Sequence, residues 1–250
     1  MANFRIIDSH VHCGVQNVSW GWEKVQPLLK NAGIRGAGLI PPVEDIYDRD
    51  DPRFLDSPEW QAARRRAHDY LLALNDPEID IFPYFFVWND FAREDLGPEY
   101  AAIKWHRHAG EPEYRYGDPR CREFIEAARE KKRPILLEET FENTLNFLDK
   151  LAPHSPVILP HLGGLNGGYE ALEKTGVWER PQVYADTALA PLREIKAYIW
   201  RYGTERLIFG SDHPFGSPAT ELNQILSLNL PEGQTQAILA DNFRRVCGLE

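Results

Sequence analysis

The sequence contains few cysteines, and Cys13, Cys121 and Cys247 are widely spaced with no CxxC pair. An odd, scattered set argues against a disulfide framework and favours a reducing cytosol. Residues 1–8, MANFRIID, lack the long apolar run of a signal peptide and lead directly into a strand-like pattern. We therefore expect a cytoplasmic protein.

Long apolar runs and a surplus of basic residues are also missing. No stretch approaches the ~18 consecutive apolar residues of a membrane span, so we expect no membrane partner. The formal net charge is −10 and the isoelectric point is near 5.3, which leaves no basic surplus to neutralise phosphates. The charge argues against a nucleic-acid partner, and we expect a small-molecule substrate.

The composition that is present is typical of a soluble domain with a full core. The chain has 250 residues, of which 43% are hydrophobic and 26% charged. Its length suits one α/β barrel, although two small domains would also fit. Because there is no internal repeat or obvious linker, we expect residues 1–250 to form a single domain.

Short apolar runs alternate with longer helical patterns, as in βα units around a parallel sheet. The strand-like runs are Phe4–His12, Gly36–Ile40, Ile79–Trp88, Ala101–His106, Pro134–Glu138, Pro156–Leu162, Gln182–Thr187 and Arg206–Asp212. The helical patterns are Ser57–Asn75, Asp118–Lys132, Thr140–Leu151, Pro191–Tyr202, Ala219–Ser227 and Gln234–Cys247. The first two of these begin with a capping residue followed by proline.

This many strands with interleaved helices predicts an α/β protein with a (β/α)8 TIM barrel rather than an open sheet. A nucleotide-binding sheet would carry a glycine fingerprint after its first strand, and the Gly36–Gly38 region does not supply one. In a barrel, functional residues lie at the carboxyl ends of the strands.

Histidines and carboxylates collect at those strand ends. The first strand ends IIDSHVH, which places His10 and His12 two residues apart on one face. An HxH pair alone also occurs by chance or as a satisfied polar pair in a core. Later strand ends add further candidates, namely Lys104, His106, Glu138, His161 and Asp212.

Shared coordination of a cation would offset the desolvation free energy of burying these polar groups together. The mixed nitrogen and oxygen donors suit Zn²⁺, Mn²⁺ or Fe²⁺ and disfavour a sulfur-rich site. The sequence therefore predicts a divalent metal ion as cofactor, with one or two ions bound.

Several stretches in this order resemble the amidohydrolase-related family of metal-dependent barrels. They are IIDSHVH, IKWH, VILPHLGG, VYADTA and RLIFGSDHPFG, with a late Asn242 in LADNFRRVCGL. The resemblance spans residues 5–250. It implies that His10 and His12 ligate the metal and that Asp212 ligates it or accepts a proton from the bound water. It also implies that His161 shuttles a proton or binds a second ion, and that Lys104 occupies the position of a carboxylated lysine in two-metal relatives.

Glu138 departs from the family pattern, which has histidine at the end of the fifth strand. A carboxylate still ligates a metal, but it makes the site harder and shifts its preference towards Mn²⁺ or Fe²⁺. Alternatively, His106 supplies the missing imidazole from the fourth strand. We expect the metal ligands to be His10, His12, Glu138, His161 and Asp212.

Substrate contacts are expected from residues beside the metal ligands. Lys104 and His106 face the barrel mouth. Arg107 and Arg193 are candidates to hold a substrate carboxylate. Trp105 belongs to a set of aromatic residues around the mouth. The other aromatics of this set are Trp20, Trp22, Trp88 and Phe215. The remaining histidines, His68, His108, His154 and His213, are interpreted as surface or supporting residues.

These features predict a metal-dependent hydrolase in which Asp212 and His161 are catalytic and an amide, ester or lactone of a small organic molecule is cleaved. Decarboxylation of an aromatic acid is the alternative reaction, since the resemblance also covers such enzymes. A degenerate barrel that only binds a ligand is the third hypothesis, which the Glu138 departure keeps open. Barrels of this type often associate, so a homo-oligomer is compatible with the sequence.

Overall fold

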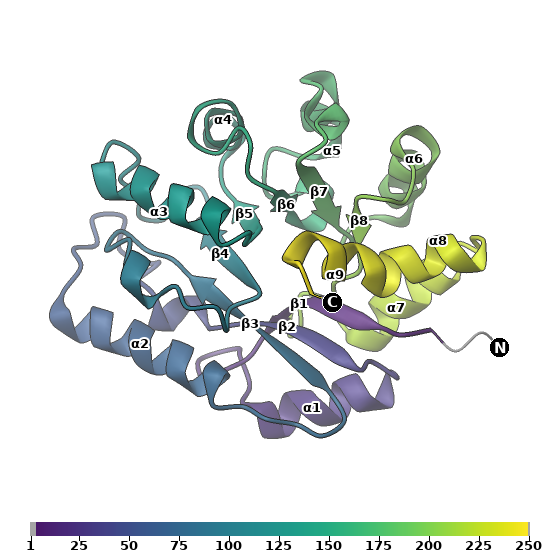
Figure 1. Cartoon of the computed structure of the whole chain (residues 1–250), viewed down its shortest axis with the longest axis horizontal. Coiled ribbons are helices and arrows are strands. Elements are labelled where there is room, and N and C mark those ends of the chain that lie inside the picture. Colours follow the sequence, from purple (N-terminus) through teal and green to yellow (C-terminus); the bar gives the residue numbers. More distant parts are fainter. Residues whose placement is uncertain (1–3, 250) are drawn as a thin grey trace.

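A computed structural model describes residues 4–249 and shows eight parallel strands in the order β1 to β8, curled into a nearly closed barrel (Figure 1). The predicted (β/α)8 fold is confirmed, and each strand lies inside its predicted range. The strands are β1 Ile7–His12, β2 Gly36–Ile40, β3 Asp80–Phe86, β4 Ala102–His106, β5 Ile135–Glu138, β6 Val157–Leu159, β7 Val183–Asp186 and β8 Leu207–Ile208.

The helices surround the strands in chain order, as the colours of Figure 1 show. They are α1 Trp22–Asn31, α2 Pro58–Leu72, α3 Pro119–Glu130, α4 Phe141–Asn146, α5 Tyr169–Lys174, α6 Leu192–Tyr202, α7 Pro218–Leu226, α8 Glu232–Gln236 and α9 Asn242–Cys247. Short 3₁₀ and π turns join several of them. Across residues 4–249, no helix has both the length and the apolar character needed to cross a membrane.

Local sequence explains which helices could be predicted. The side chains of Ser57 and Asp118 accept hydrogen bonds from the first turns of α2 and α3, as the cap-and-proline pattern predicts. Helix α1 was not predicted, because Gly21 caps it without a side chain and Pro27 lies inside it. Helix α5 was also missed, since it is only six residues long and follows a glycine-rich loop.

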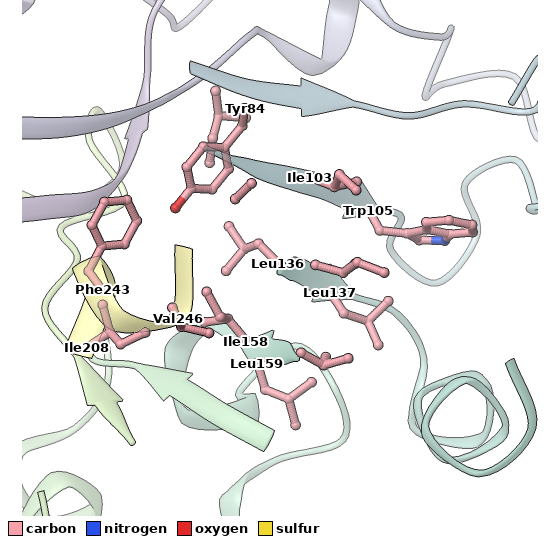
Figure 2. Packing of buried hydrophobic residues seen from close by; sticks show 14 of the residues in the cluster. Tyr84, Ile103, Trp105, Leu136, Leu137, Ile158, Leu159, Ile208, Phe243 and Val246 are labelled. Carbon is pink, nitrogen blue, oxygen red and sulfur yellow. The ribbon is translucent and has the colours of Figure 1, made fainter. Parts of the chain in front are cut away.

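Side chains alternate between the interior of the barrel and the helix layer, as the pleat of a strand requires. In Figure 2, Trp105 points away from the side chains that pack around Phe243 of α9, which include Tyr84, Leu136 and Ile158. The barrel interior around Phe243 is therefore apolar.

The seam between β1 and β8 is held by single contacts rather than by a regular ladder among the described residues. The amide of Asp212 donates to the carbonyl of His10 at 2.8 Å, and the amide of His12 donates to the carbonyl of His213 at 2.8 Å. Val11 and His213 form an isolated parallel bridge. The backbone that closes the barrel therefore belongs to the predicted ligands and their neighbours.

His68 on α2 gives the fold a measurable pH dependence. Its Nε2 accepts a hydrogen bond from the amide of Phe86 at 2.9 Å, its ring stacks on Phe85, and burial next to Arg64 lowers its pKa to about 3. Between the unfolded pKa near 6.5 and the folded pKa, the unfolded chain binds the extra proton, so stability falls as the pH is lowered.

We expect this one group to remove about 2 kcal/mol of unfolding free energy between pH 6.5 and pH 5. In His68→Gln, the loss over this interval should be smaller by that amount, as measured by urea unfolding at both pH values. An equal loss in wild type and variant would show that His68 does not titrate in this way.

Candidate active site

Three predicted ligands converge at the carboxyl end of the barrel. His10 and His12 come from β1, and Asp212 follows β8. The Oδ1 atom of Asp212 lies 3.2 Å from His10 Nε2 and 3.1 Å from His12 Nε2. These three donor atoms all lie within 4.8 Å of one another and are buried. This is the arrangement that a single divalent cation needs.

Asp186, at the end of β7, orients this cluster from behind. Its Oδ2 accepts a hydrogen bond from His10 Nδ1 at 2.9 Å, and its Oδ1 accepts one from the amide of His161 at 2.8 Å. With a proton on Nδ1, His10 presents the lone pair of Nε2 to Asp212. Asp186 lies in the stretch VYADTA and was not among the predicted site residues, although its position at a strand end was the available signal.

His161 and Asp212 have pKa values that are shifted in opposite directions. Burial lowers the pKa of His161, but the carboxylates of Glu138, Asp186 and Asp212 outweigh burial, so the net pKa is raised. Burial raises the pKa of Asp212, but His10 and His12 outweigh it, so the net pKa is lowered. An imidazole whose pKa is raised therefore faces a carboxylate whose pKa is lowered, with His161 Nε2 4.0 Å from Asp212 Oδ2.

The backbone at both residues is left-handed, with φ of 57° at His161 and 54° at Asp212. Such a conformation costs a non-glycine residue about 1–3 kcal/mol and persists only where the surroundings enforce it. Here the hydrogen bonds to Asp186 and to the carbonyl of His10 enforce it. Strain of this kind is concentrated at functional sites.

Lys104 and Glu138 form a buried ion pair inside the barrel, between β4 and β5. Lys104 Nζ also lies 3.4 Å from His10 Nε2. Burial raises the pKa of Glu138, but Lys104 and His106 outweigh it and hold the pKa well below its usual range. Glu138 is thus an ionised carboxylate in reach of His161, whose Nε2 lies 3.9 Å from its Oε1.

His106 and His108 stand on the other side of Glu138. His106 Nε2 lies 3.3 Å and His108 Nε2 lies 3.2 Å from Glu138 Oε2. Burial lowers the pKa of His106 to about 4 although the Glu138 carboxylate raises it, so the ring is neutral at pH 7. His108, interpreted from the sequence as a surface or supporting residue, is half-buried, lies beside Glu138 and lines the central cavity.

A cavity of about 450 Å³ lies above these groups. Its polar floor is formed by His12, His106, His108, Glu138, His161 and Asp212. Apolar walls come from Val18, Val43, Leu165, Leu189 and Phe215, and the loop after β2 contributes Glu44 and Arg49. Arg49 was not among the residues predicted to line the site.

Four expected substrate contacts, Lys104, Trp105, Arg107 and Arg193, do not line this cavity. Lys104 is buried in its ion pair with Glu138, and Arg193 lies at a separate surface hollow. Trp105 is fully buried on the outer face of β4, where it packs against Phe124 of α3 and Phe147. Arg107 is buried too, and it pairs with Glu139 and the carbonyl of Glu111. The strand pleat explains Trp105, because a residue between the inward-facing Lys104 and His106 must point outward.

The comparisons with known proteins agree with this fold. The sequence matches the amidohydrolase family over residues 7–249. No curated protein matches the sequence. Similar solved structures include a protein assigned as 2-pyrone-4,6-dicarboxylic acid hydrolase from Pseudomonas putida, with TM-score 0.73 and 18% identity, covering 99% of this chain and 98% of that chain.

Two decarboxylase structures are also similar. The 2,6-dihydroxybenzoate decarboxylase from Rhizobium has TM-score 0.73 and 14% identity, covering 100% of this chain and 99% of that chain. A dihydroxybenzoic acid decarboxylase from Polaromonas sp. JS666, with bound manganese and 2-nitroresorcinol, has TM-score 0.72 and 15% identity, covering 100% of this chain and 98% of that chain. These identities show the fold alone, whereas the family match spans nearly the whole sequence. The chain therefore belongs to the amidohydrolase family.

Proposed function

We propose that this protein is a metal-dependent hydrolase that cleaves an amide, ester or lactone of a small organic substrate. One observation carries the proposal: Asp212, whose pKa is lowered, and His161, whose pKa is raised, face each other beside the converging donors of His10 and His12, at the floor of the cavity. Groups with pKa values pushed apart in this way are suited to act as base and acid.

The donor set fits a divalent cation. His10, His12 and Asp212 would hold it, and His161 and Glu138 form an overlapping group with His10 whose donor atoms also lie within 4.8 Å. Zn²⁺, Mn²⁺ and Fe²⁺ all accept such nitrogen and oxygen donors. When bound, the ion supplies Lewis-acid polarisation and a water of lowered pKa.

The side chains of this chain supply the proton transfers. Asp212 accepts a proton from the attacking water, since its carboxylate stays ionised. His161 donates a hydrogen bond, and then a proton, to the oxygen or nitrogen that leaves the scissile carbonyl. Its Nδ1 donates to the carbonyl of Ala188 at 2.8 Å, which fixes the ring so that Nε2 faces the reacting group.

The apolar walls and Arg49 support a substrate with a flat or apolar body and an acidic group. Arg49 carries two hydrogen bonds to Glu111 and is the lining residue with a guanidinium group. The three cysteines are free and buried, which supports a cytoplasmic location as part of the proposal.

The test begins with protein stripped of metal by a chelator and resupplied with Zn²⁺, Mn²⁺ or Fe²⁺. It is assayed on a panel of amides, esters and lactones in ¹⁸O-labelled water. We expect activity to depend on the added ion, and one label to appear in the product acid. Full activity of the stripped protein, or no hydrolysis of any panel member with any ion, counts against the proposal.

Decarboxylation of an aromatic acid is the second candidate, because the cavity walls are apolar and two of the similar structures are dihydroxybenzoate decarboxylases. In that reaction, the proton donor would protonate a ring carbon instead of a leaving group. Release of CO₂ from hydroxybenzoates without label in the aromatic product would favour this reaction over hydrolysis.

Asp186 should affect the affinity of the His10, His12 and Asp212 cluster for a divalent ion without being a ligand of that ion. Replacing it with asparagine weakens the acceptor of His10 Nδ1, and such outer partners typically account for about 10–100-fold in metal affinity. We expect a loss of this size for Asp186→Asn in calorimetric titrations with Mn²⁺ or Zn²⁺. Asp149→Asn, at an exposed ion pair with Arg180, is the matched control. Equal affinities in all three proteins would contradict this role.

A further inference from the structure

A second set of metal-type donors lies in the cavity, apart from the cluster of His10, His12 and Asp212. His106 ends β4, His108 follows two residues later, and Glu138 ends β5. The two Nε2 atoms lie 3.3 Å and 3.2 Å from one carboxylate oxygen, Glu138 Oε2. All three donor atoms lie within 4.8 Å of one another.

Both imidazoles are supported at their other nitrogen. His106 Nδ1 lies 3.0 Å from the hydroxyl of Tyr47, which itself donates to Glu111 Oε2 at 2.7 Å. His106 therefore donates from Nδ1 and keeps a lone pair on Nε2. His108 Nδ1 lies 3.2 Å from the donor Arg49 Nη2 and 3.5 Å from Glu111 Oε1. Glu111 thus supports His106 through Tyr47, as outer carboxylates do behind metal-bound histidines, and it holds Arg49 beside His108.

The Nε2 atoms of His106 and His108 converge on one carboxylate oxygen of Glu138. A cation placed among these three donor atoms would be within reach of all of them. The other oxygen of Glu138 is occupied by Lys104, so Oε2 is the oxygen left for a ligand.

We propose that His106, His108 and Glu138 form a second divalent-metal site, separate from the cluster of His10, His12 and Asp212. Two imidazoles and one carboxylate are a donor set that binds Zn²⁺ and leaves a position open for water or substrate. All three residues line the cavity, so the open position faces the substrate. The two histidines come from β4 and the loop that follows it, and the site does not depend on which reaction the enzyme performs.

The position of the site suggests its use. A substrate that fills the cavity between the two clusters meets one ion on each side, with His161 between them. An acidic or phenolic oxygen of the substrate is the chemical group that this second ion would bind. Arg49 lines the same cavity beside His108, with its Nη2 3.2 Å from His108 Nδ1.

The test counts Zn²⁺ ions that stay with the protein after metal stripping, reloading and desalting. Wild type is compared with His108→Gln and His12→Gln, one variant for each site. His154→Gln is the control, because His154 is exposed and lies before β6, at the opposite end of the barrel. We expect two ions in wild type and control, and one ion in each of the other variants. Circular dichroism checks that each variant is folded.

The outcomes separate this proposal from the proposed function. If only His12→Gln loses an ion, the second site does not exist, while the first site stands. If only His108→Gln loses an ion, the second site is supported and the metal assignment of the proposed function fails. Wild type without bound Zn²⁺, or no loss in either variant, overturns the inference.

A second measurement covers the case in which His108→Gln fails to fold. Crystals of wild-type protein soaked in Zn²⁺ should give an anomalous-scattering peak among His106 Nε2, His108 Nε2 and Glu138 Oε2. A peak at the other cluster with none here overturns the inference regardless of the behaviour of the variant.

Discussion

Replacement of Asp212 by asparagine is expected to lower kcat by about 10³-fold or more, since a positioned base contributes about 10²–10⁴-fold and the charge proposed to ligate the metal is lost as well. The carboxylate contacts His10 Nε2 and His12 Nε2, and it faces His161. Asparagine tolerates the left-handed backbone at φ 54°, so the substitution removes the charge without forcing the loop to move.

The measurement is kcat and KM on any substrate identified in the hydrolase panel, with metal content determined in parallel. A fall in kcat with KM little changed would mark a group that acts in the transition state. Asp149→Asn serves as the control for removing a carboxylate elsewhere. A kcat within a few-fold of wild type would show that Asp212 is not the base.

Replacement of Lys104 by methionine is expected to cost about 3–5 kcal/mol of unfolding free energy, because it leaves the Glu138 carboxylate buried without its partner. Methionine fills a similar volume, so the loss reports the charge rather than a cavity. Urea unfolding of metal-free protein in the presence of a chelator measures it without compensation by an ion.

Two further variants make this result specific. In Lys104→Met/Glu138→Leu both charges are gone, and the stability should recover to within about 1–2 kcal/mol of wild type. Lys30→Met breaks the exposed pair of Lys30 with Glu78 and should cost about 1 kcal/mol or less. If Lys104→Met costs no more than Lys30→Met, the buried pair does not stabilise the barrel.

The sequence was sufficient for the barrel and for the first cluster of the site. Buried parallel strands read as apolar runs, and strand ends share one edge of a barrel, so His10, His12, His161 and Asp212 could be brought together before any coordinates were known. The predicted ranges were too long at β6 and β8, because the apolar run continues past the last hydrogen-bonded strand residue into a turn.

The rest of the site depends on contacts that spacing does not encode. Asp186 acts through His10 from another strand, and His108 lies in a loop whose path brings it back to Glu138. Arg49 reaches the cavity from a long acidic loop that reads as solvated. Trp105 is the instructive error, since the alternation that pairs Lys104 with His106 already excluded it from the barrel interior.

The contacts between β1 and β8 can form only late in translation, because they join the first strand to the last. His12 and Asp212 are 200 residues apart in the chain, and the backbone around them joins the first strand to the last. A chain emerging from the ribosome can pair β1 with β2 early, but the other edge of β1 has no partner until β8 is made. If the proposed ion binds at His10, His12 and Asp212, its ligands are therefore complete only after residue 212 has been synthesised.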